Sequence, residues 1–312
     1  MDYEFQRLSK ENLGDVARIH KIVYKHEISP EVLRKKYDTG FLGVEYCGYL
    51  AYYDGAPVAF YGVLPAASHW GNKVEISAQS MDSMTIETHQ RKGLFSRLAN
   101  KTFELAKEMG VTFVWGFGTD VSERAVIEKL NFCRDERVQG YRFFARKRLL
   151  DKFFNKVPAL RPMVEKRTKR ILQKHTTNRT FQGSLYTMTD CPMITRNAAY
   201  FQHKSFTDTF VIELESVMFW IKLHPHHGIM IGDIEASDEA QLGKGMLAFK
   251  SLVDHNGLGT FMFQTSPGTP TEKVALELSD ETFPSWGVCY LPLGSEFPLE
   301  KLKITWGDLD TF

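Results

Sequence analysis

The sequence predicts a mixed α/β (α+β) fold, in which helices flank a central mixed and twisted sheet. Two observations predict this class. The chain has 312 residues, of which 43% are hydrophobic, so it can bury a large core and hold two domains of ordinary size. Apolar segments of strand length also alternate with segments of helical periodicity along both halves of the chain. That alternation is typical of a sheet with helices packed on its faces.

The first half is predicted to contain these elements in a definite order. We expect strands at 3–8, 48–53, 58–64 and 74–86, and helices at 11–24 and 30–37. Asp54 and Gly55 form the turn that joins two of the strands as a hairpin. The segment 81–118 then predicts a strand end, a short basic turn, an amphipathic helix and a second apolar strand, and a further helix follows at 122–132.

The basic turn is suited to holding a phosphate. Gln90, Arg91, Lys92 and Gly93 bring two cations and a residue without a side chain to the point where a helix begins. The first N–H groups of a helix have no partner inside it, and the positive end of the helix dipole favours an anion there. Gly93 lets the backbone come close to the ligand. The turn therefore predicts an anion site.

At these residues the chain resembles the GCN5-related N-acetyltransferase (GNAT) superfamily. The signature Q/R-x-x-G-x-G/A of that superfamily is similar to the run QRKGLF, in which Phe95 replaces the final small residue. The run EKLNF at 128–132 resembles the pattern E-K-L-G-F, and Asn131 is a mild replacement for glycine at a left-handed helix end. The resemblance covers the first half and implies the GNAT fold with acyl-coenzyme A (acyl-CoA) as the co-substrate.

The resemblance implies where acyl-CoA binds. Its pantetheine arm is expected between two splayed parallel strands, 82–86 and 111–117, and its pyrophosphate at the basic turn. The implied binding residues are Met84, Thr85, Ile86, Gln90, Arg91, Lys92, Gly93, Leu94, Phe95, Ser96, Thr119 and Asp120.

Asp82 is the first candidate for a general base, because family members often place a glutamate near this position and Gln79 cannot take a proton. The alternative is that Asp82 lies on a solvated strand face. His69 and His89 are second candidates, with ordinary pKa values of about 6.5.

The tyrosine that usually acts as the acid in the family corresponds here to Ile127. Either the thiolate leaves without a side-chain acid, or another group assists it. Ser122, with Thr119 and Asp120, could hydrogen-bond the sulfur from the turn between strand and helix.

The composition excludes some partners and favours one compartment. A formal net charge of +1 gives no global electrostatic case for binding nucleic acid or an anionic membrane. The N-terminus has no apolar signal region, and no run approaches the length of a membrane span, so we expect a cytoplasmic protein. The four cysteines are scattered and are expected as free, mostly buried thiols.

The chain divides into three predicted parts. Residues 1–146 form the acyl-CoA-binding domain, 147–177 a basic helical connector, and 178–312 a second, degenerate GNAT-like domain that contributes to the acceptor pocket. The connector's basic residues are expected on a solvated face, although Arg161, Arg167 or Arg170 could meet a diphosphate.

The second half repeats the order of the first. We expect strands at 209–214, 217–223, 229–234, 260–265 and 286–291, with helices at 237–254 and 271–279. Lys244 and Gly245 resemble Lys92 and Gly93, but the opening Gln or Arg is missing and the glycine falls inside the helix. We therefore expect no cofactor there. An unrelated α+β domain is the alternative.

No metal site is predicted. His224, His226 and His227 match no zinc template, and Pro225 indicates an exposed loop.

The resemblance implies an N-acyltransferase that transfers a short acyl group to a primary amine. A long chain with an additional C-terminal domain resembles bacterial enzymes that acylate nucleotide-linked (dTDP or UDP) amino sugars for surface polysaccharides. One alternative is an aminoglycoside or polyamine acceptor, for which Asp233, Glu235, Asp238 and Glu239 could form an acidic pocket. The other is a non-catalytic acyl-CoA sensor, which the departures at Phe95 and Ile127 favour.

Overall fold

The computed structural model describes residues 2–118, 120–145, 161–224 and 227–312. Within these residues, 12 strands form one mixed sheet in the order β1-β2-β3-β4-β5-β12-β6-β11-β10-β9-β8, with β7 paired to β3. The strands are β1 (Glu4–Arg7), β2 (Gly48–Tyr53), β3 (Ala56–Trp70), β4 (Lys73–Thr85), β5 (Val111–Gly118), β6 (Cys133–Phe144), β7 (Met193–Ile194), β8 (Thr209–Leu214), β9 (Val217–His224), β10 (Gly228–Glu235), β11 (Thr260–Thr265) and β12 (Glu281–Pro292). The predicted α/β class is confirmed.

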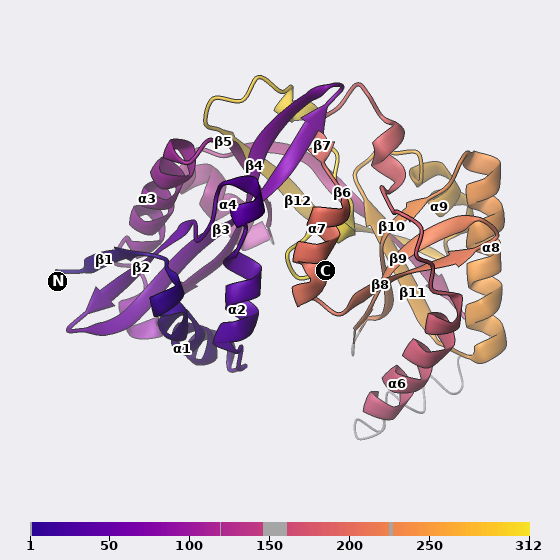
Figure 1. Ribbon diagram of the computed structural model, residues 1–312, viewed down its shortest axis with the longest axis horizontal. Helices are drawn as coiled ribbons and strands as arrows, with labels where there is room; N and C mark the ends of the chain where they lie inside the picture. The colour runs from indigo at the N-terminus through magenta and orange to yellow at the C-terminus, as the bar shows by residue number, and fades with distance from the viewer. Residues whose placement is uncertain (1, 119, 146–160, 225–226) are drawn as a thin grey trace.

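Helices cover both faces of this sheet (Figure 1). The α-helices are α1 (Leu13–Tyr24), α2 (Pro30–Tyr37), α3 (Leu94–Glu108), α4 (Asp120–Leu130), α6 (Arg161–Leu172), α7 (Ala198–His203), α8 (Glu239–Asn256) and α9 (Glu272–Leu278). Local chemistry sets their ends: Ser29 caps α2 by accepting the N–H of Val32, and Pro30 occupies the first turn, where a missing N–H costs nothing.

The predicted elements of the first half are present. Asp54 and Gly55 both have positive φ, 49° and 75°, which is the geometry of a two-residue hairpin turn. One prediction was too short: β3 continues past Leu64 to Trp70. The extension pairs with β4 as far as Lys73, and β7 adds to it at Ser68 and His69. Pairing with β4, and at two residues with β7, therefore continues the strand beyond the predicted segment.

The second half repeats the connections of the first. In the first half β3 and β4 are antiparallel, and α3 leads from β4 to the parallel strand β5. In the second half β9 and β10 are antiparallel, and α8 leads from β10 to the parallel strand β11. Gly245 lies inside α8, as predicted, where a Cβ would come within 2.5 Å of the Val217 side chain. The predicted repeat of element order is confirmed.

The two halves exchange strands at the centre of the sheet. β12, from the end of the chain, lies between β5 and β6, and β6 lies between β12 and β11. The division at 146 and 178 stays a prediction, because strands from both sides of it interleave. The first part of the predicted connector, residues 147–160, lies outside the described residues. Its last part is α6.

The C-terminal residues and α7 lie between the two halves (Figure 1). An apolar cluster joins them there, and it includes Trp115 of β5, Trp220 of β9, and Trp306 and Phe312 near the chain end. The Trp220 and Phe312 rings are 4.9 Å apart between centroids. This packing fixes the last ten residues against both halves.

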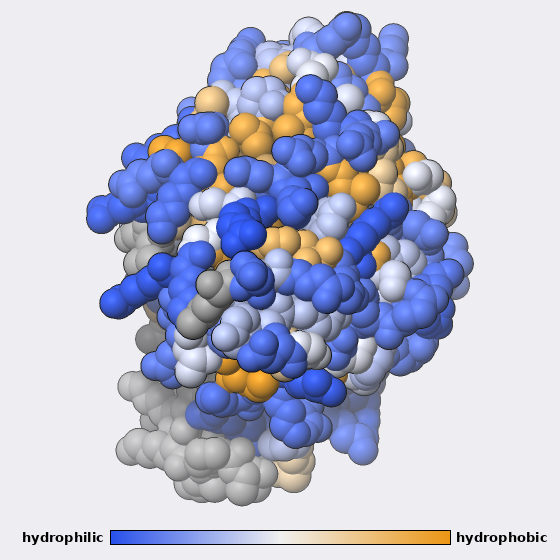
Figure 2. All heavy atoms as spheres, turned by 90° about the vertical axis from the view of Figure 1, so that its left-hand side faces the viewer, coloured by the Kyte–Doolittle hydropathy of each residue, from blue (hydrophilic) through white to orange (hydrophobic). Residues whose placement is uncertain are grey.

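The outer face of the first half is mostly hydrophilic, with hydrophobic residues appearing between hydrophilic ones (Figure 2). Among the described helices, none has both the length and the apolar character that crossing a membrane requires. Cys47, Cys191 and Cys289 are buried and Cys133 is exposed, and all four thiols are free, as predicted.

Candidate active site

β4 and β5 part near the middle of the sheet. They pair in parallel from Ile76 and Val111 as far as Gln79 and Trp115, and no later pair is found between them in the described chain, although both strands continue. A β-bulge in β4 lies just beyond this point. Phe60 of β3 pairs with Met84 and Gly62 pairs with Met81, so that Asp82 and Ser83 together oppose Tyr61. The bulge bends β4, and Asp82 has a φ of 42°.

A cavity of about 370 Å³ opens where the strands part. Asp82 and Ser83 line it from β4, Phe117 from β5, Phe95 from α3 and Ser122 from α4. The Phe95 ring packs edge-on against Tyr61, 5.8 Å between centroids. The structure therefore brings two predicted catalytic residues, Asp82 and Ser122, to one cavity. Phe95, the residue that differs from the superfamily signature, lines the same cavity.

The predicted anion turn leads into α3 beside this cavity. Gly93 has a φ of 75° and begins the helix, and the Gln90 side chain donates to the carbonyl of Thr85, 3.2 Å away. In this described turn no side chain caps the helix, and its first turn carries no acid. Arg91 and Lys92 are exposed. The backbone N–H groups of the first turn and two cations are thus arranged as an anion requires.

The remaining predicted binding residues differ in what they can offer. The side chains of Leu94 and Met84 are buried in the core, so only their backbone groups could meet a ligand. Thr85 and Ile86 are half-buried at the end of β4, and Ser96 is half-buried in the first turn of α3. Thr119 lies outside the described residues, and so does the side chain of Asp120, whose backbone begins α4.

Asp82 belongs to a buried chain of charges. Its Oδ2 accepts hydrogen bonds from Lys36 Nζ at 2.8 Å and from the Tyr37 hydroxyl at 2.6 Å. Lys36 Nζ also donates to Asp310 Oδ2, 2.7 Å away. The side chain of Asp82 is 18% exposed and that of Lys36 only 8%. Asp82 therefore does not lie on a solvated strand face.

These contacts set the protonation state of Asp82. Burial opposes ionisation, but the charge of Lys36 and the hydrogen bonds from Lys36 and Tyr37 outweigh it, so the pKa of Asp82 lies below its ordinary value. Both hydrogen bonds end on Oδ2. Within the described residues, Oδ1 has no hydrogen-bond partner, so the ionised oxygen can meet a ligand in the cavity.

Sequence reasoning missed Lys36, Tyr37 and Asp310. One signal existed for Lys36: it lies between Leu33 and Tyr37 on the buried stripe of α2, where a cation needs a partner. No comparable signal marks Asp310, which is 274 residues from Lys36 in the sequence.

The structure does not bring His69 to the cavity. His69 pairs across the strands with Val74, which is eight residues before Asp82, or roughly 26 Å along β4. Its ring bonds the Thr195 hydroxyl at 2.9 Å, and burial lowers its pKa. His89 contacts the Tyr3 hydroxyl at 3.0 Å. Ile127 of α4 packs against the core, while the Tyr24 side chain lines the cavity, a residue that the sequence did not single out.

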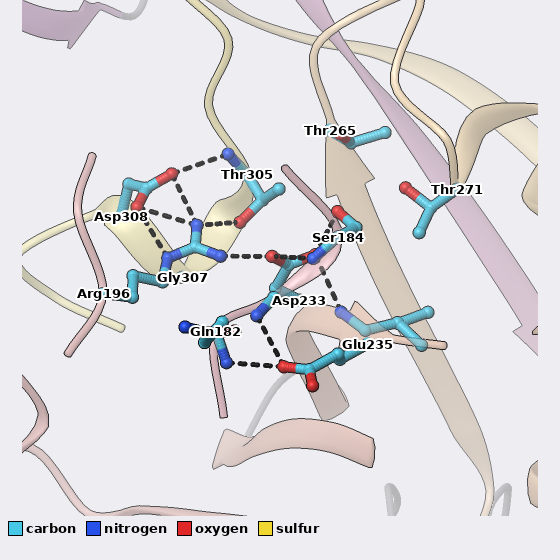
Figure 3. Close-up of polar contacts among 12 residues, drawn as sticks. Gln182, Ser184, Arg196, Asp233, Glu235, Thr265, Thr271, Thr305, Gly307 and Asp308 are labelled. Atoms are coloured by element: carbon cyan, nitrogen blue, oxygen red, sulfur yellow. Dashed lines mark hydrogen bonds and ion pairs between the residues drawn. The ribbon is translucent and has the colours of Figure 1, made fainter. Parts of the chain in front are cut away.

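In the second half β10 and β11 correspond to β4 and β5, and the last ten residues of the chain lie beside them. β10 and β11 pair only from Ile229 and Phe261 to Ile231 and Phe263, and the C-terminal segment packs beside their ends. Thr305 bridges to Thr265, and the N–H of Ser266 donates to the carbonyl of Ile304 at 2.9 Å. Figure 3 shows Arg196 holding this segment: its guanidinium contacts Asp233 of β10 and lies 2.8 Å from Asp308.

The four acids predicted for an acidic acceptor pocket all have structural partners. Asp233 pairs with Arg196 and accepts the Ser184 hydroxyl, and Glu235 accepts the N–H groups of Gln182 and Gly183 (Figure 3). Asp238 caps α8, and Glu239 pairs with Lys273.

The rings of His224 and His227 are 4.5 Å apart between centroids, and His226 lies outside the described residues. In the part of the chain that the structure describes, no group of three or more His, Cys, Asp or Glu side chains is arranged to hold a metal ion.

The first half of the chain is similar to known proteins. Residues 4–132 match the acetyltransferase (GNAT) domain family. A GCN5-related N-acetyltransferase from Kribbella flavida superposes with a TM-score of 0.61 at 11% identity, covering 94% of this chain and 72% of the other. A putative acetyltransferase from Pyrococcus horikoshii gives 0.56 at 17% identity over 98% and 94% of the two chains. A probable N-acyltransferase of unknown function from Enterococcus faecalis V583 gives 0.63 at 8% identity over 94% and 73%. No curated protein matches the sequence.

Proposed function

We propose, starting from the GNAT acetyltransferase domain that residues 4–132 carry, that this protein transfers a short acyl group from acyl-CoA to a primary amine. The observation that carries the proposal is the parting of β4 and β5 beside an uncapped helix start, with an ionised carboxylate in the cavity between them. The acceptor that we propose is the amino group of a nucleotide-linked amino sugar.

The anion turn and the open edge of β4 would hold acyl-CoA. The N–H groups at the start of α3, with Arg91 and Lys92, suit a pyrophosphate, because they offer fixed donors and positive charge. The backbone of Met84, Thr85 and Ile86 would pair with the pantetheine arm as an added strand does. Phe95 lines the cavity at a position where a smaller residue is usual in the superfamily.

Asp82 is placed to receive the amine. Its Oδ1 would bind the incoming ammonium and accept one of its protons. The neutral nitrogen would then attack the carbonyl carbon of the thioester, which supplies the acyl group. Its low pKa makes Asp82 a weak base, so orientation is its larger contribution, and orienting two bound reactants is worth up to about 7–11 kcal/mol. As the carbon–sulfur bond breaks, the Ser122 or Tyr24 hydroxyl, both on the cavity wall, would hydrogen-bond the departing sulfur.

Thiol release tests the proposal. Purified protein would be given acetyl-CoA and 3-hydroxybutyryl-CoA with nucleotide-linked 3- and 4-amino sugars, aminoglycosides and polyamines, while released thiol is followed with a chromogenic disulfide. We expect release that depends on an amine. Asp82→Asn should lower kcat by roughly 10²-fold or more while the Kd for CoA stays unchanged. Glu296→Gln is the control, because Glu296 is an exposed carboxylate paired with Lys73 and lies outside the cavity lining, and it should behave as the wild type.

Two results would contradict the proposal. Bound CoA without thiol release across the whole panel would support the acyl-CoA sensor instead. Release with polyamines or aminoglycosides alone would replace the amino-sugar acceptor, while keeping the transferase.

A further inference from the structure

A second cavity, of about 600 Å³, is lined by residues from both halves of the chain. Its walls come from β6, β9, β12 and the C-terminal segment, and its volume is in the range of ordinary ligand sites. Nothing in the proposed handling of acyl-CoA uses it.

The cavity is basic. Arg137, Arg142 and Lys222 line it, and no Asp or Glu is among its described lining residues. Arg142 pairs with Glu281 at 2.7 Å and Arg137 with Glu123 at 3.1 Å, but Glu123 is shared with Arg134. Lys222 donates to the carbonyl of Thr311, and within the described chain it has no ion pair. An anion bound in the cavity would give the Lys222 ammonium an ion-pair partner.

The partial burial of Lys222 adds to this argument. The pKa of Lys222 is lowered, chiefly because burial removes water from its ammonium, while Asp310 and Asp208 only partly oppose the shift. A partly buried ammonium is stabilised more by a bound anion than a fully solvated ammonium is, because water screens the attraction less.

The same cavity also offers flat apolar surfaces. Trp286, Trp306 and Phe283 are among its lining residues, and the Trp286 ring packs edge-on against Phe117, 6.1 Å between centroids. Tryptophan faces are suited to stacking against a heterocycle. Cations and aromatic rings in one cavity together match a ligand that joins a planar base to a phosphate group.

The cavity adjoins the candidate active site at two points. Gly118, at the end of β5, lines both cavities. Thr311 lines the basic cavity, and its neighbour Asp310 contacts Lys36, which holds Asp82. A ligand anchored in the basic cavity could therefore extend a sugar and its amine toward Asp82.

We propose that this basic cavity binds the nucleoside diphosphate part of the acceptor, with Lys222 and Arg142 on the phosphates and a tryptophan on the base. The inference rests on the proposed transferase function and deepens it by assigning the acceptor a binding site.

Titration calorimetry tests the site directly. UDP, dTDP and inorganic pyrophosphate would each be titrated into the full chain already saturated with CoA, so that the CoA site is filled. We expect both nucleotides to bind one to one. Lys222→Met should weaken them about tenfold or more, as loss of one charge-assisted hydrogen bond predicts, and Arg142→Gln should do the same. Lys303→Met is the matched control. Lys303 is also part-buried and pairs with Glu136, but it lies outside the cavity lining. The variant should therefore bind the nucleotides as tightly as the wild type does.

Kinetics separate the acceptor from a free nucleotide. With an amino sugar nucleotide, Lys222→Met should raise KM about tenfold and leave kcat unchanged, and with a small amine it should change neither. An unchanged KM for the amino sugar nucleotide in Lys222→Met would overturn the inference.

Other outcomes would also overturn it. Failure of both nucleotides to bind, pyrophosphate binding as tightly as UDP, or loss of nucleotide binding when CoA is present would each exclude this site. If nucleotides do not bind while thiol is still released with small amines, the transferase function is supported and the acceptor site is excluded. If nucleotides bind but no amine is acylated, the transferase function is excluded and the nucleotide site is supported.

Discussion

The Lys36 ammonium lies 2.8 Å from the Asp82 carboxylate, and this ion pair ties α2 to the bulge at which β4 leaves β5. The pair is largely buried, so it fixes both the position and the negative charge of Asp82, which we place beside the reacting amine. A second carboxylate, Asp310, lies 2.7 Å from the same ammonium and brings the end of the chain into the site.

Removing the cation should shift the pH dependence of catalysis. In the wild type Asp82 stays ionised well into acid, so activity falls only as pH drops through its lowered pKa. In Lys36→Met burial dominates and the pKa of Asp82 rises, so the acid limb of kcat/KM should move to higher pH. The profile of kcat/KM between pH 4 and 9 measures this shift. Lys35→Met removes a neighbouring exposed cation and should leave the limb in place. An unshifted limb in Lys36→Met would mean that another group titrates.

Gly93 should matter for CoA binding beyond its effect on stability. A Cβ at Gly93 meets nothing within 4 Å, but its φ of 75° costs an L-residue about 1–2 kcal/mol. Relief of that strain would turn the N–H groups of the first turn of α3, so Gly93→Ala should weaken CoA about tenfold by calorimetry.

Gly71→Ala is the matched control for this substitution. Gly71 lies in the turn between β3 and β4 with a φ of 55° and also has open space around it. Its alanine variant should lose similar stability and keep the affinity for CoA. Equal affinities in the two variants would argue against a phosphate at the turn.

Sequence patterns predicted the parts of this protein that depend on local order. The strand, turn and helix from Met81 to Gly118 could be placed because a strand, a short basic turn with a glycine and an amphipathic helix follow each other within 38 residues. The second half was predicted as a repeat for the same reason.

Long-range contacts decide what the sequence could not predict. Lys36 meets Asp82 across 46 residues and Asp310 across 274, and no local pattern links them. The position of β12 between β5 and β6 is of the same kind, since it depends on where the end of the chain returns.

Arg196 should be essential for holding the C-terminal segment. Its side chain is 1% exposed, and those of Asp233 and Asp308, which it contacts, are fully buried. Arg196→Met leaves two carboxylates buried without a cation, which should lower the free energy of unfolding by about 3–5 kcal/mol in urea titration. Arg179→Met is the control. The Arg179 side chain is 57% exposed, so its pair with Glu213 should contribute at most about 1 kcal/mol. Equal losses would show that the network is not what anchors the segment.

Lys204 should make the stability of the fold depend on pH. It is buried beside the same segment, donates to the carbonyl of Leu309, and burial lowers its pKa to about 7. Above pH 7 the folded state holds Lys204 neutral while the unfolded chain still binds the proton up to its ordinary pKa of 10.5. The unfolded state then binds more protons, so the free energy of unfolding should rise with pH, by at most about 1.4 kcal/mol per unit.

Urea titrations at pH 7 and pH 9 would measure this slope in the wild type and in two variants. Lys204→Met removes the titrating group and should flatten the rise by about 2 kcal/mol across the two units. Lys250→Met removes a part-exposed lysine paired with Asp280 and should keep the wild-type slope, which corrects for tyrosines and cysteines that ionise in the unfolded chain. If Lys204→Met keeps the full slope as well, Lys204 is charged in the folded protein at neutral pH, and its ammonium is then stabilised by Asp308 and Asp310 despite its burial.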